Sequence, residues 1–299
     1  MKRNTTKKQK AFARKVGLMD FVIKGIPSFY WSDFYHWLMT ISWRQLWVII
    51  ISFYFVINTI FALLYLGSGD GVHNAKPGSF IDAFSFSIQT IATIGYGAMY
   101  PTNIYTHILV AIEVFIGLIG IAMITGLMFA RFSLPTARVL FSRIAVISPY
   151  DGVPTLMFRI ANQRQNWIVE AEVKATVLLN KEVSIEGHSL RKFGDLKLVR
   201  SETPMLSLTW LVMHQIDKDS PLYGWSEDDF KNINNQSIQL FITLTGLDET
   251  VSQTIHARHV YRLDQILWHQ RFVDLISTGI DGRFYLDYSL FHDVVPLQK

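Results

Sequence analysis

Residues 93–97, which read Thr-Ile-Gly-Tyr-Gly, could bind cations through their own backbone. A cation that has lost its water shell needs closely stacked rings of oxygen atoms, and successive backbone carbonyls can supply them. The carbonyls share one direction only if left- and right-handed backbone conformations alternate, and Gly95 and Gly97 adopt positive φ at little steric cost. One chain supplies a quarter of each ring, so the pattern predicts four copies around one axis. The expected oxygen-bearing residues are Thr93, Ile94, Gly95, Tyr96 and Gly97.

A short apolar helix is expected directly before this segment. Lys76-Pro77-Gly78 breaks the chain, and Ser79 followed three residues later by Asp82 has the spacing of a capping box. The apolar residues from there to Ile91 are too few to span a bilayer. Irregular backbone survives at membrane depth only where protein or water surrounds it, so we expect a re-entrant segment. The partial negative charge at the carboxyl end of the helix would favour a cation.

Two long apolar runs flank the re-entrant segment. Residues 46–66 carry no charge, and residues 104–130 carry one acid, Glu113, and one histidine, His107. Each run is long enough to cross a bilayer as a helix. Basic residues gather before the first run and after the second, so both termini are expected to be cytoplasmic.

Glu113 is an acid inside an apolar run, and such a group is expected to face protein or water rather than lipid. We expect it to lie behind residues 93–97 and to support them by hydrogen bonds. The alternative is a position near the outer mouth, where the carboxylate simply reaches water.

The amino terminus is basic, with eight Lys or Arg against Asp20 in the first 24 residues. This region is too long for the basic part of a signal peptide, and no cleavage site follows the apolar run. We favour a disordered basic tail beside a membrane over a nucleic-acid-binding arm, and we expect no nucleic-acid partner.

An amphipathic helix is expected between this tail and the first apolar run. Phe34, Trp37, Leu38 and Ile41 recur at helical spacing, which is typical of a helix that lies along the inner leaflet. The alternative is an extension of the first span, which would place nearby polar residues such as Asp33 in hydrocarbon.

The second half of the chain has a different texture. Apolar and polar residues alternate over 168–179, 206–212 and 238–245, with Gly, Asp and Pro clusters between these runs. This pattern predicts an antiparallel sandwich with one wet face. The expected division is a basic N-terminal cytoplasmic tail over 1–30, a transmembrane pore domain with its interfacial helix over 31–134, and a cytoplasmic β-sandwich over 135–299.

Several classes of chemistry are excluded or disfavoured. The chain has no cysteine, which excludes disulfides, thiolate catalysis and iron–sulfur clusters. No catalytic triad order, phosphate loop or metal cluster stands out, so we expect no enzyme, no cofactor and no metal other than permeant ions. His256 and His259 lie on a predicted strand, where this spacing places them on opposite faces, so we interpret them as structural.

Residues 93–97 match the signature of potassium channels, and their place between two spans and after a short helix makes the match specific. The second half resembles the cytoplasmic domain of inward-rectifier potassium channels. The similar stretches are residues 156–162, 168–171, 214–224, 257–261 and 271–274. From about residue 30 to residue 293 the chain looks most like the prokaryotic branch, the KirBac family.

This resemblance implies an all-α membrane pore joined to an all-β immunoglobulin-like sandwich. It implies a homotetramer in a cell membrane, the inner membrane in a prokaryote, that conducts potassium passively without voltage-dependent gating. It also implies regulation by lipids and an interfacial helix that slides as the pore opens. Gating at the inner-helix bundle is implied for Gly117, Gly120, Ile121, Gly126 and Phe129, with Gly117 as the hinge and Phe129 as the ring that closes the bundle.

The chain also departs from its relatives. The two extracellular cysteines of eukaryotic members are absent. Gln89 replaces the glutamate that many relatives have in the short helix, and we expect it to support residues 93–97 together with Glu113. The basic run that binds lipid headgroups in eukaryotic members is reduced to Arg131 and Arg138, our candidates for anionic headgroups. Ile121 lacks the carboxylate of strongly rectifying members, so weak rectification is expected.

Two other functions compete with selective potassium conduction. The first is a non-selective cation pore on the same fold, against which the intact 93–97 string argues. The second is a membrane-anchored sensor without transport, in which the re-entrant segment would have no purpose.

Overall fold

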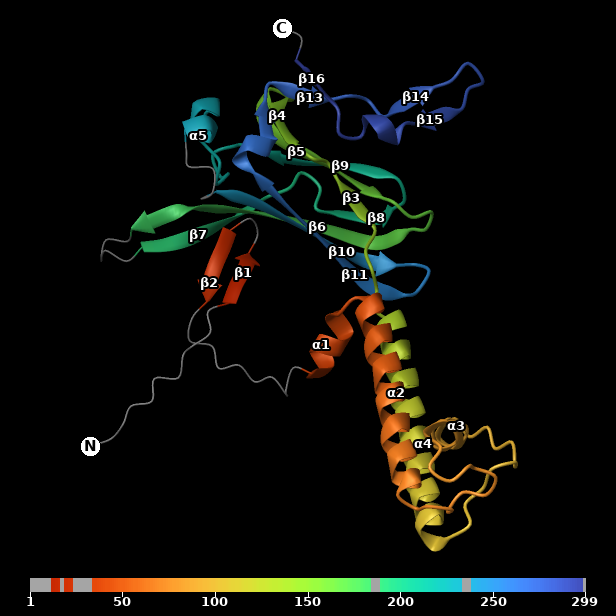
Figure 1. The fold of residues 1–299 in the computed structure, drawn as a ribbon. Coiled ribbons are helices and arrows are strands. Elements are labelled where there is room, and N and C mark those ends of the chain that lie inside the picture. Colours follow the sequence, from red (N-terminus) through yellow and green to blue (C-terminus); the bar gives the residue numbers. More distant parts are fainter. Residues whose placement is uncertain (1–11, 17–18, 24–33, 184–188, 233–237, 298–299) are drawn as a thin grey trace, which may run out of the picture. The chain divides into compact units, whose positions relative to one another are not determined.

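The computed structural model describes residues 12–16, 19–23, 34–183, 189–232 and 238–297 (Figure 1). The chain separates into two compact units. One unit is helical and covers residues 27–134, and the other covers 135–299 together with the N-terminal segment.

The described residues of the helical unit form four helices: α1 (Phe34–Thr40), α2 (Trp43–Leu66), α3 (Phe80–Ile91) and α4 (Ile104–Phe132). Helices α2 and α4 are long and apolar enough to cross a membrane, and they contain the two apolar runs read from the sequence. The two long helices lie side by side, and α3 packs against both of them (Figure 1). This arrangement buries one face of α3, around Ala83, Phe86 and Ile91.

Helices α1 and α2 are separate elements, so a continuous extension of the first span is wrong. Ser42 ends the break between them with a complete capping box, in which its side chain accepts from the Gln45 backbone and the Gln45 side chain accepts from the Ser42 backbone. This reciprocal pair satisfies two backbone donors at the start of α2 and defines where the new helix begins.

At the start of α3, Ser79 accepts from the Asp82 amide at 3.2 Å, as the capping spacing predicts. The Asp82 carboxylate, however, accepts from the Lys76 amide at 2.9 Å. The capping box is therefore only half formed, because the acid closes the turn before the helix.

In the second unit, the described residues form two five-stranded sheets and three small two-stranded sheets. In one sheet the order is β11-β10-β6-β7 with β8 on β6, and in the other it is β12-β4-β5-β3 with β9 on β5. All pairs in these sheets are antiparallel except β12 with β4. The strands of the sheets are β3 (Val139–Phe141), β4 (Ala145–Tyr150), β5 (Val153–Asn162), β6 (Ile168–Val183), β7 (Ser189–Leu196), β8 (Glu202–Leu206), β9 (Thr209–Gln215), β10 (Gln239–Asp248), β11 (Gln253–Arg262) and β12 (Ile266–Trp268). The remaining elements are β1 (Phe12–Val16) with β2 (Met19–Ile23), β13 (Gln270–Phe272) with β16 (Val294–Pro296), β14 (Ile276–Thr278) with β15 (Phe284–Leu286), α5 (Glu227–Asn232), and the short 3₁₀ turns at Leu263–Gln265 and Tyr288–Leu290.

The inner faces of the two sheets share one apolar core. Phe158 and Ile160 from β5 are essentially buried in one sheet, and the buried Val173, Ile242 and Tyr261 face them from β6, β10 and β11 of the other. The alternating pattern along each strand produces this arrangement, because successive side chains point to opposite faces. The unit is an immunoglobulin-like sandwich, as the resemblance implies.

Two expectations need correction. The alternating run over 206–212 is not one strand: β8 ends at Leu206 in one sheet, and β9 begins at Thr209 in the other. Leu208 lies in the connection and is 54% exposed, so its place in the alternation is accidental. The basic tail is also not wholly irregular, because β1 and β2 form an antiparallel hairpin in which Lys15 lies opposite Asp20 in the strand register.

His214 on β9 is a buried, neutral histidine. Its Nδ1 faces the Lys197 carbonyl oxygen at 2.8 Å, so this nitrogen carries the proton, and its Nε2 lies 2.8 Å from Ser220 Oγ. Burial lowers the pKa of His214 below its ordinary value of 6.5, although the Lys197 carbonyl and Asp217 act in the opposite direction. Burial lowers the pKa of His259 on β11 as well.

We expect the sandwich to lose stability as the pH falls below about 6.5. In this range the unfolded chain binds protons at His214 and His259 that the native protein does not bind, so the free energy of unfolding falls by up to about 1.4 kcal/mol per pH unit for each. His214→Gln should flatten the slope, and His256→Gln, at an exposed position, should leave it unchanged. Pulse proteolysis of the full chain in urea at several pH values measures this, and equal slopes in all three proteins would contradict it.

Candidate functional site

The backbone of residues 93–97 alternates in handedness. Thr93, Gly95 and Gly97 have φ of 54°, 60° and 80°, and the two residues between them are not left-handed. The glycines were expected to adopt this conformation, but Thr93 was not, because a side chain makes positive φ costly. A local interaction must therefore hold Thr93 in place.

The end of α3 supplies that interaction. The Ile94 amide donates to the Gln89 carbonyl at 2.8 Å, and the Thr93 amide donates to the Thr90 carbonyl at 3.0 Å. These two bonds form a Schellman motif with Thr93 at the left-handed position that glycine usually occupies. The helix end thus sets the direction in which residues 93–97 leave α3.

The carbonyl oxygens of residues 93–97 have no hydrogen-bond donor within the part of the chain that the structure describes. All five residues are exposed in the single chain. Backbone carbonyls normally find a partner in protein or water, so these oxygens are available to a ligand. A row of such oxygens is suited to a cation.

The far end of the segment is fixed by its own contacts. The Asn74 side chain donates to the Ala98 carbonyl at 2.8 Å, and the His73 amide donates to the Tyr100 carbonyl at 2.8 Å. The His73 and Tyr100 rings stack with centroids 4.5 Å apart. Hydrogen bonds and stacking thus join the two arms of the loop in a chain that has no cysteine.

Glu113 on α4 is fully buried and lies against α3. It accepts from the Tyr65 hydroxyl of α2 at 2.5 Å, and its other oxygen lies 2.5 Å from Ser87 Oγ of α3. Ser87 Oγ is also 3.0 Å from Asn58 Oδ1 of α2. The alternative in which Glu113 reaches water is wrong, because the residue is 0% exposed.

Sequence reasoning missed Asn58, Tyr65 and Ser87. The signal was present for two of them, since Asn58 interrupts the first apolar run and Ser87 lies among the apolar residues of the short helix. Polar groups at such positions normally bond one another. The Gln89 side chain has no partner within the residues that the structure describes, and its carbonyl accepts from the Ile94 amide. A supporting role for this side chain stays a prediction.

The residues with implied gating roles all lie on α4, which continues unbroken through Gly117. A β-carbon at Gly117 would lie 2.6 Å from the Ile91 carbonyl oxygen, closer than real contacts allow. At Gly120 and Gly126 a β-carbon would meet nothing within 4 Å in the chain. The Ile121 and Phe129 side chains are exposed in the single chain.

Arg131, a candidate for lipid headgroups, binds α1. Its guanidinium donates to the Leu38 and Ile41 carbonyls at 3.1 and 2.6 Å and lies 4.5 Å from the centre of the Trp43 ring. Arg138 is exposed, and its carbonyl accepts from the Gln163 amide. The two basic residues are therefore not equivalent.

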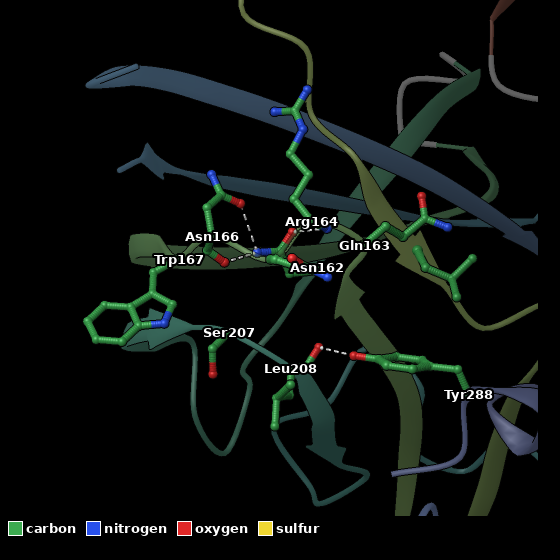
Figure 2. A pocket seen from close by; sticks show the side chains of 10 residues that line it. Asn162, Gln163, Arg164, Asn166, Trp167, Ser207, Leu208 and Tyr288 are labelled. Carbon is green, nitrogen blue, oxygen red and sulfur yellow. Dashed lines mark hydrogen bonds between the residues drawn. The ribbon is translucent and has the colours of Figure 1, made fainter. Parts of the chain in front are cut away.

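A surface pocket of about 580 Å³ lies beside the loop between β5 and β6 (Figure 2). Much of its polar lining is already hydrogen-bonded within the protein. Asn162 Nδ2 donates to the Asn166 carbonyl at 2.6 Å, and the Tyr288 hydroxyl donates to the Leu208 carbonyl at 3.2 Å. Arg164 is paired with the buried Asp248 at 2.9 Å. We therefore take residues 93–97, and not this pocket, as the candidate site.

Comparisons with known proteins show which family the chain resembles. Residues 139–299 match the profile of the inward rectifier potassium channel C-terminal domain, and residues 49–133 match the ion channel profile. The chain is 47% identical over 263 residues to the inward rectifier potassium channel Kirbac3.1 of Paramagnetospirillum magnetotacticum, which is 88% of each protein. These matches confirm the resemblance found in the sequence.

More distant relatives are eukaryotic. The chain is 32% identical over 292 residues to the G protein-activated inward rectifier potassium channel 1 of Homo sapiens, and 30% identical over 286 residues to channel 2 of Mus musculus. Each match covers 88% of this chain, but only 56% and 66% of those two proteins.

We expect Gly117→Ala to destabilise the helical unit by about 1–3 kcal/mol, because the new methyl group would overlap the end of α3. Gly120→Ala is the matched control on the same helix, and it should be neutral or slightly stabilising because alanine favours helix. Thermal unfolding in detergent measures both. Equal stability of the two variants would contradict the close approach of α3 and α4.

Proposed function

Because this chain belongs to the inward rectifier potassium channel family, we propose that it conducts potassium through backbone carbonyls of residues 93–97. It is a membrane protein with two membrane-capable helices, and its family consists of ion channels. The single observation that carries the proposal concerns the backbone of residues 93–97. Thr93, Gly95 and Gly97 have positive φ in alternation with their neighbours, and the carbonyls of the segment accept no hydrogen bond from the described residues. Successive oxygens of this kind replace the water shell of a permeating potassium ion.

Four copies are required by this mechanism, since one chain contributes one quarter of each oxygen ring. The exposure of residues 93–97 in a single chain supports such an assembly. So do the large apolar side chains exposed on α4, among them Ile121 and Phe129. In the proposed homotetramer these side chains face neighbouring copies, the pore or lipid.

The proposed gate lies on the last turns of α4, at the Phe129 ring. Ile121 and the α4 glycines line the path to it, and the interfacial helix α1 moves with the gate. Both termini and the sandwich are proposed to be cytoplasmic. Anionic lipid headgroups are proposed partners, with the exposed Arg138 as the better candidate because the Arg131 guanidinium is already engaged by α1. No cofactor other than permeant potassium is proposed.

We expect purified protein in lipid vesicles to take up rubidium, and we expect barium to block this uptake. Potassium should compete with rubidium, whereas sodium should not, because the oxygen rings suit the larger ions. Equal competition by sodium would support a non-selective cation pore. Absence of any uptake by an intact tetramer would support a sensor without transport.

We expect Gly95→Ala to abolish selective uptake. An L-residue at its φ of 60° costs about 1–2 kcal/mol and turns a carbonyl away from its neighbours. Gly69→Ala is the matched control, because Gly69 has a similar φ of 64° but lies outside the 93–97 segment. It should keep rubidium selectivity, and loss of selectivity in both variants would contradict the assignment.

A further inference from the structure

The buried polar cluster of Tyr65, Glu113, Ser87 and Asn58 defines its own proton positions. All four residues are at most 2% exposed, so water does not supply missing partners. Each hydroxyl has one proton to donate, and each neutral amide has a fixed donor end and acceptor end. Counting protons along the cluster therefore tests whether Glu113 is ionised.

The orientation of the Asn58 side-chain amide is fixed by a bond to the backbone. Its Nδ2 donates to the Tyr54 carbonyl at 2.7 Å. The reversed amide would bring two acceptor oxygens together at that distance, so the orientation follows from the bond. The acceptor Oδ1 of Asn58 must then face Ser87.

Ser87 has contacts on two sides. Its Oγ lies 3.0 Å from Asn58 Oδ1, which can only accept, so the single Ser87 proton points to Asn58. The same Oγ lies 2.5 Å from Glu113 Oε1. This second contact needs a proton of its own, and Ser87 has none left.

Tyr65 cannot supply the missing proton. Its hydroxyl donates to the other oxygen of the carboxyl group, Glu113 Oε2, at 2.5 Å. A proton on Oε1 of Glu113 completes every bond. We propose that Glu113 is a protonated carboxylic acid that donates to Ser87 within a one-way chain from Tyr65 to the Tyr54 carbonyl.

The surroundings favour the neutral acid. Glu113 makes no ion pair with any residue that the structure describes. An ionised carboxylate with no cationic partner is very costly away from water, and especially in a membrane span. When Glu113 is neutral, each of the four side chains donates one hydrogen bond to the next group in the series. Hydrogen bonds arranged in such a series strengthen one another.

This series of hydrogen bonds joins α3 to both long helices, because Asn58 and Tyr65 lie on α2 and Glu113 lies on α4. It therefore positions the helix from which residues 93–97 emerge, and Glu113 acts as a positioning residue through Ser87. Glutamine has the length of glutamate, one acceptor and one donor end, so it can replace the protonated acid but not a carboxylate that accepts two bonds.

The experiment compares infrared spectra of the full-length wild-type protein and Glu113→Gln in lipid vesicles at neutral pH. We expect the wild type to show the carbonyl stretch of a protonated carboxylic acid, and we expect Glu113→Gln to lack it. In Ser87→Ala this stretch should move to higher frequency, because the acid loses its acceptor. A wild-type spectrum that differs from Glu113→Gln only in carboxylate bands would overturn the proposal.

Thermal unfolding gives a second measurement. Glu113→Gln should unfold within a degree or two of the wild type. Glu113→Leu should unfold about 5 °C or more lower, since it removes the acceptor of the Tyr65 hydroxyl and the donor to Ser87. A Glu113→Gln protein as unstable as Glu113→Leu would count against the neutral acid. Neither readout requires conduction, so a failure of the proposed potassium flux is distinguishable from a failure of this inference.

Discussion

The structure of the helical unit depends on one constraint, which is that the carbonyls of residues 93–97 accept no hydrogen bond from the residues that the structure describes. Peptide carbonyls tend to find donors, so the chain must hold this segment away from its own amides. The Schellman motif does so at one end by engaging the Thr93 and Ile94 amides with α3. At the other end Asn74 binds the next carbonyl, that of Ala98. The segment is thus held at both ends and open in the middle.

The placement of α3 rests on two contacts of different physical kind. Hydrogen bonds through Ser87 depend on angle, so they fix the rotation of α3 about its axis relative to α2 and α4. The contact of Gly117 with Ile91 is steric and fixes how closely α4 approaches the carboxyl end of α3. A directional contact and a distance contact together determine the position of a rigid helix better than two contacts of either kind.

Much of this could be predicted from the sequence, because apolar run length and period-two alternation report spans and strands directly. The separate start of α2 and the positive φ of Gly95 and Gly97 were also predicted from the residue types and their spacing. Thr93 could not be foreseen, since its left-handed conformation arises from hydrogen bonds at a helix end and not from its residue type. Leu208 misled the strand assignment because alternation continues by chance across the connection between two sheets. The partners of Glu113 required knowledge of which helices meet.

Arg131 shows why charge patterns alone do not assign a partner to a basic residue. A guanidinium after a membrane span is equally suited to a lipid phosphate and to the carbonyls at the end of a helix. Helix α1 has only seven residues, too few for much stability of its own, so a cation at its carboxyl end is a substantial part of what holds it. A headgroup that bound Arg131 would have to replace the Leu38 and Ile41 carbonyls and the Trp43 ring. Any effect of lipid at this position would therefore act on α1 first, and on the proposed gate at Phe129 through α1.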